Sequence, residues 1–285
     1  MKHYLKLMRP HHYIKNFLVF AALACSGQLF DPQKFLAGCL GFAAFCMISS
    51  VVYIINDIRD VEKDRRHPTK CRRPIAAGTV TIRNAWILAA VLATLAAVCN
   101  GLIFQPLSSG LLALYLLLNL AYSFGLKNIP IVDITILVSG FLMRILYGAF
   151  VTEIVISNWL YLTVIALAFY FALGKRRNEL KQLGDGETRK VLEAYPLGFL
   201  DKSMNMCLSL AIIFYSLWSM ADSTVAAYGQ YLVFTVPVVM LIVMKYSLNV
   251  EGDSDGDPVE VLLHDKVLLA LCVLYLAAMF SILYL

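Results

Sequence analysis

Three aspartates with helical spacing lie where a long apolar run ends. Asp57, Asp60 and Asp64 follow Asn56 within residues 56–64. At about 100° per residue, the three carboxylates fall within roughly 60° of one another on a helix and can converge from one face. Carboxylate oxygens suit hard cations such as Mg²⁺, which usually takes about one or two protein carboxylates and completes its shell with water and phosphate oxygens. The segment therefore indicates a magnesium site for a phosphate-bearing substrate. A solvated, charged helix end is the alternative, which the position at the end of a hydrophobic helix disfavours.

Basic residues follow the aspartates and recur in a second charged segment. Residues 65–74 form a basic tract that includes Arg73, and a later segment contains Lys175, Arg176 and Glu179. Lys175 and Glu179 are four residues apart and therefore face the same way on a helix. Several cations around one carboxylate favour an anion site over a second metal site. A helix end whose basic side chains reach toward water is the alternative.

Further polar residues lie within or beside apolar segments. Arg144 would lie about 16 Å along a helix from Asp133, at 1.5 Å per residue. An arginine at that depth needs an anion, a carboxylate or a polar cavity, so both a binding role and a structural pair are open. Lys127 either marks a membrane boundary or contacts phosphate. Lys15 and Asn16 enter an apolar segment, where anchoring at the membrane interface and phosphate contact are both open.

Membrane-spanning helices must position these residues. Hydrophobic residues make up 60% of the 285-residue chain and charged residues 15%, and the mean hydropathy is +0.73. Soluble domains carry about a quarter charged residues. Apolar runs of about 18 to 22 residues can cross a hydrocarbon core of about 30 Å as helices, which satisfy their own backbone hydrogen bonds. We predict an all-α membrane bundle that forms a single domain over residues 1–285. Its nine expected spans are residues 14–30, 36–57, 83–104, 107–125, 130–151, 157–178, 203–221, 226–247 and 265–285.

The distribution of basic residues predicts the orientation. Of the 24 lysines and arginines, all but Lys34 and Arg144 fall on one side of the predicted spans or in the last few residues of a span at that side. The positive-inside rule places that side, together with the N-terminus, in the cytoplasm. We expect the active-site loops near residues 58–82 and 175–202 to face the cytoplasm from the plasma (inner) membrane. The same topology explains the net charge of +5, so no nucleic-acid partner is expected.

The pattern Asn-Asp-x-x-Asp-x-x-x-Asp at a membrane exit resembles that of the UbiA superfamily of intramembrane prenyltransferases. The span count and the second charged loop extend the resemblance over the whole chain. Most members have an Asp-rich second loop, whereas this chain has Lys175-Arg176-Arg177 and Glu179 there. Further motifs resemble a narrower family, the decaprenyl-phosphate phosphoribosyltransferases. These motifs are Arg9-Pro10, Lys15-Asn16, His67-Pro68-Thr69-Lys70, Arg73-Pro74-Ile75-Ala76-Ala77-Gly78, Thr188-Arg189-Lys190 and Gly256-Asp257-Pro258.

The resemblance implies a UbiA-like fold and a Mg²⁺-dependent membrane enzyme. It would transfer 5-phosphoribose from phosphoribosyl diphosphate (PRPP) to a polyprenyl phosphate such as decaprenyl phosphate and release diphosphate. Asp57, Asp60 and Lys175 would be catalytic, and Asn56, Asp57, Asp60 and Asp64 would hold the metal. The implied donor-binding residues are Arg73, Tyr122, Lys127, Lys175, Arg176 and Glu179, and the implied acceptor-binding residues are Lys15, Asn16 and Arg144.

Two other functions share part of this pattern. A UbiA-type enzyme that joins a prenyl diphosphate to an aromatic acceptor would have the same first motif and topology. A transporter would use the carboxylates for ion coupling, but transport favours charges near the middle of the membrane and interrupted helices. The sequence leaves open whether the chain forms a homo-oligomer.

Overall fold

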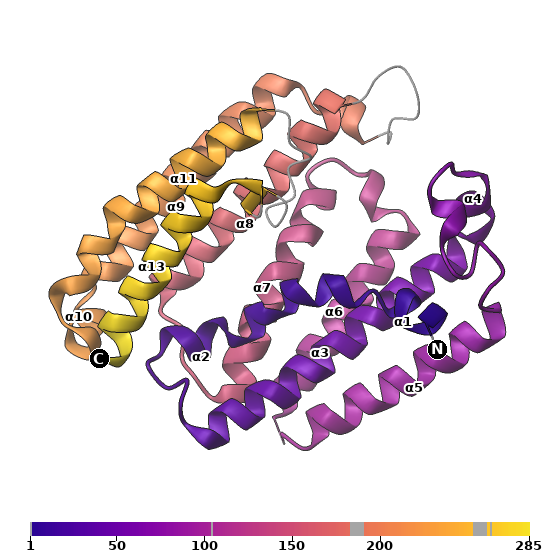
Figure 1. The fold of residues 1–285 in the computed structure, drawn as a ribbon, viewed down its shortest axis with the longest axis horizontal. Helices are drawn as coiled ribbons and strands as arrows, with labels where there is room; N and C mark the ends of the chain where they lie inside the picture. Colours follow the sequence, from indigo (N-terminus) through magenta and orange to yellow (C-terminus); the bar gives the residue numbers. More distant parts are fainter. Residues whose placement is uncertain (1, 104, 183–190, 253–260, 263) are drawn as a thin grey trace. The chain divides into compact units, whose positions relative to one another are not determined.

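The computed structural model describes residues 2–103, 105–182, 191–252, 261–262 and 264–285, and every regular element in these ranges is a helix (Figure 1). The motifs at residues 188–190 and 256–258 lie outside the described residues. Within the described ranges, eight helices are long and apolar enough to cross a membrane. The predicted all-α membrane bundle is therefore confirmed. The chain divides into two compact units.

The first expected span differs from the prediction. Residues 14–30 do not form one long α-helix, because the 3₁₀ helix η1 (Pro10–Phe20) leads into the short helix α2 (Ala21–Cys25). A 3₁₀ helix rises about 2.0 Å per residue, more than the roughly 1.5 Å of an α-helix, so η1 covers more length per residue. Residues 14–30 are therefore not among the eight helices of the described ranges that could cross a membrane, and the predicted count of nine spans is corrected at this segment.

The first unit comprises Met1–Leu126 and Met143–Val155. Its longest helix, α3 (Pro32–Arg59), is capped by Asp31, whose carboxylate accepts hydrogen bonds from the backbone N–H groups of Gln33 and Lys34. Helix α5 lies beside α3 (Figure 1). The other helices of this unit are α1 (Lys2–Met8), α4 (Val61–Arg66), η2 (Lys70–Arg72), α5 (Ile82–Gly101), α6 (Pro106–Phe124) and the second half of α7 (Val132–Thr152).

A glycine on α7 lets this helix approach η1 closely. A Cβ at Gly148 would lie 1.8 Å from the carbonyl oxygen of Val19, far inside van der Waals contact. The rings of Phe45, Tyr115 and Tyr147 pack together beside this contact in the buried core. The core of the first unit therefore joins the N-terminal segment to α3, α6 and α7.

The second unit comprises Lys127–Leu142 and Ile156–Leu285. Helices α8 (Asn158–Gln182) and α9 (Leu197–Met220) lie side by side over most of their length (Figure 1). Helix α11 packs against α9 and against α13. The first part of α7, up to Leu142, also belongs to this unit. The remaining helices are η4 (Leu192–Ala194), α10 (Asp222–Tyr228), η5 (Gln230–Thr235), α11 (Val236–Glu251) and α13 (Lys266–Tyr284), and the division between the two units in the sequence falls within η3 (Leu126–Asn128).

Candidate active site

The aspartate segment keeps the helical register that the sequence predicts. Helix α3 ends at Arg59 and α4 begins two residues later. Across this junction the backbone N–H of Asp60 donates to the carbonyl of Asn56 at 2.9 Å, and that of Asp64 donates to the carbonyl of Asp60 at 2.8 Å. Because the i to i−4 pattern continues, Asp57 and Asp64 lie on the same face, and both are buried.

Two arginines neutralise these buried carboxylates. Nη1 of Arg73 lies 3.2 Å from Oδ1 of Asp57 and 2.7 Å from Oδ2 of Asp64. Nη2 of Arg9 lies 2.5 Å from the same Oδ1 of Asp57, and its guanidinium stacks 5.1 Å above the ring of Tyr53. Two carboxylates and two guanidiniums thus form one charge-balanced cluster, which we call the Asp57–Arg73 cluster.

The remaining residues of the first motif lie at the edge of this cluster. Asn56 accepts a hydrogen bond from the hydroxyl of Ser123 on α6, which fixes its amide. Asp60 is partly exposed at the junction of α3 and α4. Two of the three aspartates therefore converge on one point, and the third lies nearer the surface.

The second charged segment contains a buried ion pair. Nε of Arg176 donates to Oδ2 of Asp133 at 2.7 Å, with 1% of the arginine side chain and none of the aspartate side chain exposed. Nη1 of Arg176 donates to Oε2 of Glu179 at 2.6 Å. The predicted donor-binding Arg176 thus pairs with two carboxylates. Lys175, beside it, is partly exposed.

A tyrosine completes this buried network and holds a strained turn. The Tyr195 hydroxyl donates to Oδ1 of Asp133 at 2.6 Å and accepts the backbone N–H of Ile131 at 2.5 Å. Ile131 has a φ of 69°, a left-handed conformation that is costly for a β-branched residue. Burial and the hydrogen bond to Asp133 raise the pKa of Tyr195 to about 12, so the phenol remains a donor at neutral pH.

Arg144 is buried among polar and aromatic neighbours of the first unit. Its Nε donates to Oδ1 of Asn16 at 2.8 Å, and its Nη2 donates to the hydroxyl of Tyr115 at 3.1 Å. The guanidinium also lies 5.0 Å from the ring centre of Phe45. Two predicted acceptor-binding residues, Asn16 and Arg144, are therefore brought together, while Lys15 is partly exposed on η1.

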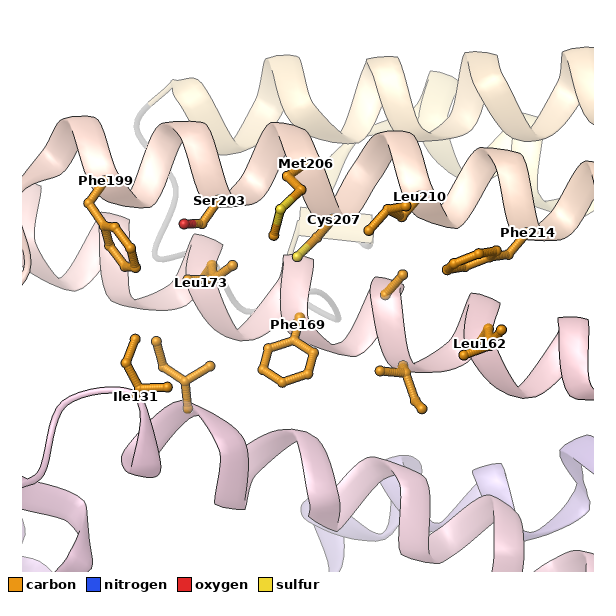
Figure 2. Close-up of a pocket in the computed structure, with 13 residues that line it drawn as sticks. Ile131, Leu162, Phe169, Leu173, Phe199, Ser203, Met206, Cys207, Leu210 and Phe214 are labelled. Carbon is orange, nitrogen blue, oxygen red and sulfur yellow. The ribbon is translucent and has the colours of Figure 1, made fainter.

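The second unit contains an elongated apolar pocket of about 290 Å³ (Figure 2). Side chains of α9 lie along one side, from Phe199 to Phe214, and Phe169 of α8 faces them. Along α8 the lining runs from Leu162 to Leu173, about 16 Å at 1.5 Å per residue. Apart from Ser203 and Cys207, the side chains that line the pocket are apolar, so the pocket suits a hydrocarbon chain. Its other lining residues are Ile131, Ile134, Ile165, Ala166, Met206 and Leu210.

Comparison with known proteins identifies the family. The model of the UbiA prenyltransferase family matches residues 16–263. The chain belongs to the UbiA prenyltransferase family. It is 37% identical over 279 residues to the decaprenyl-phosphate phosphoribosyltransferase of Mycolicibacterium smegmatis, covering 93% of this chain and 87% of that protein. It is 34% identical to the enzyme of the same name from Corynebacterium glutamicum, covering 93% of this chain and 81% of that protein.

Solved structures of UbiA proteins share the fold of this chain. A UbiA homologue from Archaeoglobus fulgidus bound to GPP and Mg²⁺ superposes with a TM-score of 0.69 at 17% identity, covering 99% of both chains. A structure of digeranylgeranylglyceryl phosphate synthase has a TM-score of 0.70 at 18% identity and covers 99% of this chain and 98% of that one. The family and the UbiA-like fold inferred from the sequence motifs are therefore confirmed.

The Asp57–Arg73 cluster of this UbiA chain fits a divalent cation. Two buried carboxylate oxygens, from Asp57 and Asp64, point at one cationic nitrogen, and oxygen donors of this kind are what Mg²⁺ prefers. In the part of the chain that the structure describes, no group of three or more His, Cys, Asp and Glu side chains gathers where a metal could bind. Ligation by Asp60 and Asn56 therefore stays a prediction.

The UbiA motifs did not indicate several residues that the structure places in these networks. Asp133 and Tyr195 surround Arg176, and Tyr115 contacts Arg144. Asp133 and Arg176 are separated by 43 residues, and no local spacing links them. Arg9 belongs to the Arg9-Pro10 motif, and the structure pairs it with Asp57. Tyr122 and Lys127, predicted to bind the donor, are partly exposed on α6 and η3.

Proposed function

We propose that this UbiA-family chain transfers 5-phosphoribose from PRPP to a polyprenyl phosphate such as decaprenyl phosphate and releases diphosphate. The observation that carries the proposal is the similarity, over nearly the whole chain, to proteins named decaprenyl-phosphate phosphoribosyltransferase. Lys175 in the second segment supports it, because a positive charge there suits a 5-phosphate that stays on the substrate throughout the reaction.

We assign the donor's diphosphate to the first motif. Asp57 and Asp64 would hold Mg²⁺, with Asp60 and Asn56 beside them. The ion would act as a Lewis acid that stabilises the departing diphosphate. Arg73 would add a guanidinium for the same phosphates. The carboxylates of Asp57 and Asp64 are buried, so neither can be lost without leaving positive charge unbalanced in the cluster.

We assign the donor's 5-phosphate to Lys175, with Tyr122 and Lys127 as further donor contacts. Arg176 and Glu179 pair with each other, and Asp133 holds the other edge of the guanidinium. A direct phosphate contact by Arg176 would require it to exchange one of these carboxylates. We therefore give Arg176 and Glu179 the role of positioning the helix end that carries Lys175.

The acceptor is a lipid phosphate, which is already ionised near neutral pH. Its oxygen would attack C1 of the ribose as the bond to diphosphate breaks through an oxocarbenium-like transition state. No general base is needed for this step. Lys15, Asn16 and Arg144 are proposed acceptor contacts, and the apolar pocket along α8 and α9 would hold part of the isoprenoid chain. PRPP is soluble and arrives from the cytoplasm, so we place the reaction at the cytoplasmic face of the plasma membrane.

The test is transfer of label from PRPP to lipid. Purified protein in detergent is incubated with Mg²⁺, ribose-labelled PRPP and decaprenyl phosphate, and a parallel reaction contains geranylgeranyl diphosphate with an aromatic acceptor. We expect a labelled lipid with PRPP, loss of turnover in Asp57→Asn, and normal turnover in Glu62→Gln, which alters an exposed ion pair. Consumption of the prenyl diphosphate with no labelled lipid from PRPP would replace our proposal by aromatic prenyl transfer.

A further inference from the structure

Arg73 lies where a metal ion that bridges the facing oxygens of Asp57 and Asp64 would bind. A single nitrogen, Nη1, contacts Oδ1 of Asp57 at 3.2 Å and Oδ2 of Asp64 at 2.7 Å. Oxygens bound to Mg²⁺ lie about 2.0–2.1 Å from the ion. The guanidinium nitrogen and the ion cannot both occupy the space between these two oxygens. A metal ion that bridges Oδ1 of Asp57 and Oδ2 of Asp64 and the observed contacts of Arg73 therefore exclude each other.

The two arginines of the cluster are held by different contacts. Arg9 stacks on the ring of Tyr53, contacts only Asp57 of the two carboxylates, and has 20% of its side chain exposed. The Arg73 side chain is 30% exposed and projects from a turn after η2. The backbone of this turn is fixed, because Arg73 N–H donates to the Lys70 carbonyl at 2.9 Å and Ala77 N–H donates to the Arg73 carbonyl at 2.8 Å. A change of partner by the Arg73 side chain would therefore leave both of these backbone hydrogen bonds intact.

We propose that Arg73 is an exchangeable cation that occupies the metal position until a divalent cation arrives, and that it then turns to the phosphates of the donor. The proposal rests on the proposed function for the identity of the donor. Before exchange, two guanidiniums balance two carboxylates. A divalent cation adds two positive charges, and the released guanidinium stays on the same turn. The cluster is then positively charged, which favours a diphosphate. Arg73 therefore couples metal binding to donor binding.

Binding of Mn²⁺ in the absence of any donor tests the exchange directly. Mn²⁺ prefers the same oxygen ligands as Mg²⁺, and its free concentration is read from its electron paramagnetic resonance signal. Wild type, Arg73→Gln and Arg65→Gln are titrated. Arg65 is the matched control, because it lies on α4 and pairs with the exposed Glu62. Removing a competing charge-assisted bond should tighten Mn²⁺ binding roughly tenfold or more in Arg73→Gln. Arg65→Gln should bind Mn²⁺ as wild type does.

The same titration with inorganic diphosphate tests the coupling. Diphosphate should tighten Mn²⁺ binding in wild type, and this gain should be several-fold smaller in Arg73→Gln because the released guanidinium is missing. Arg73→Gln that binds Mn²⁺ no more tightly than wild type would overturn the proposal, since Arg73 would then only orient the carboxylates. An equal gain from diphosphate in both proteins would overturn the coupling.

A footprint on the wild-type protein keeps the proposal testable if Arg73→Gln fails to fold. Phenylglyoxal modifies accessible guanidiniums, and peptide mass spectrometry reports the extent at each arginine. Mg²⁺ should increase modification of Arg73 and leave that of Arg65 unchanged, and diphosphate added with Mg²⁺ should protect Arg73. Unchanged or reduced modification of Arg73 on adding Mg²⁺ would overturn the exchange.

The outcomes of these measurements test the exchange at Arg73 separately from the proposed function. They use only metal and inorganic diphosphate, so a chain that consumes a prenyl diphosphate instead of PRPP would still show them. Absence of PRPP transfer with both metal results intact would refute the proposed function alone. PRPP transfer without either metal result would refute the exchange alone.

Discussion

Asp133→Asn should destabilise the second unit by about 3 kcal/mol, because it removes the charge that faces Arg176 inside the protein. Asparagine keeps the size of the side chain and one oxygen, so the substitution isolates the charge. The Tyr195 hydroxyl can still donate to that oxygen. What is lost is the compensation of a guanidinium that is only 1% exposed.

The expected size follows from the contacts of Arg176. Removing one partner of a buried ion pair typically costs about 3–5 kcal/mol, since the other charge stays buried. Two unit charges about 4 Å apart at an effective dielectric constant of about 20 interact by about 4 kcal/mol, which agrees with that range. Glu179 still contacts Nη1 of Arg176 at 2.6 Å and is 24% exposed. This second carboxylate should keep the loss near the lower limit.

The free energy of unfolding is measured by titrating SDS into detergent-solubilised protein and following far-UV circular dichroism. Glu62→Gln is the control, because Glu62 and Arg65 form a pair whose side chains are 72% and 50% exposed. Such exposed pairs contribute about 0–1 kcal/mol. An Asp133→Asn protein as stable as Glu62→Gln would refute the reasoning, since the buried carboxylate would then not compensate Arg176.

Further predictions concern the donor, the core, the pocket and pH. Lys175→Ala should weaken PRPP binding roughly ten- to a hundredfold in a donor titration, because a charge-assisted phosphate contact is lost; unchanged affinity would remove Lys175 from the donor site. Gly148→Ala should prevent folding, seen as aggregation in size-exclusion chromatography, because its methyl would lie 1.8 Å from the Val19 carbonyl oxygen; a monodisperse variant with wild-type melting would contradict this. Ala166→Phe should fill the apolar pocket and reduce turnover with decaprenyl phosphate more than with a short polyprenyl phosphate; an unchanged ratio would exclude the pocket as the acceptor site. The raised pKa of Tyr195, about 12, means that the unfolded chain ionises first, near pH 10. Stability should therefore fall as pH rises from about 10 to 12, and Tyr195→Phe should lessen that fall; an identical alkaline profile would argue against it.

The sequence predicted the helical membrane architecture well because the bilayer leaves few options. Long apolar runs must satisfy their backbone hydrogen bonds internally, so they form helices whose approximate positions follow from hydropathy. The segment before α3 differed from the predicted span over residues 14–30. It forms the 3₁₀ helix η1, which begins at Pro10 and rises further per residue than an α-helix. Hydropathy reports that a segment is apolar, but it does not distinguish 3₁₀ from α geometry.

The aspartate motif illustrates both the success and the limit of helical periodicity. The spacing predicted that the carboxylates share a face, and the backbone hydrogen bonds across the junction of α3 and α4 keep that register for Asp57 and Asp64. Periodicity did not predict that Asp60 lies nearer the surface, or that Arg73 inserts its guanidinium between the other two. Those positions depend on the turn after η2, which has no periodic signal.

The sequence by itself determined the family, the apolar helices and which residue types could carry phosphate chemistry. Each of these is encoded locally, in composition, hydropathy and motif spacing. Only the tertiary structure decided which side chains pair with the buried charged groups. Arg176 reaches Asp133 across 43 residues, and Arg144 reaches Asn16 across 128. A buried charge needs a hydrogen-bonding or oppositely charged partner. The identity of that partner depends on which distant helices pack together, and local residue spacing does not encode this.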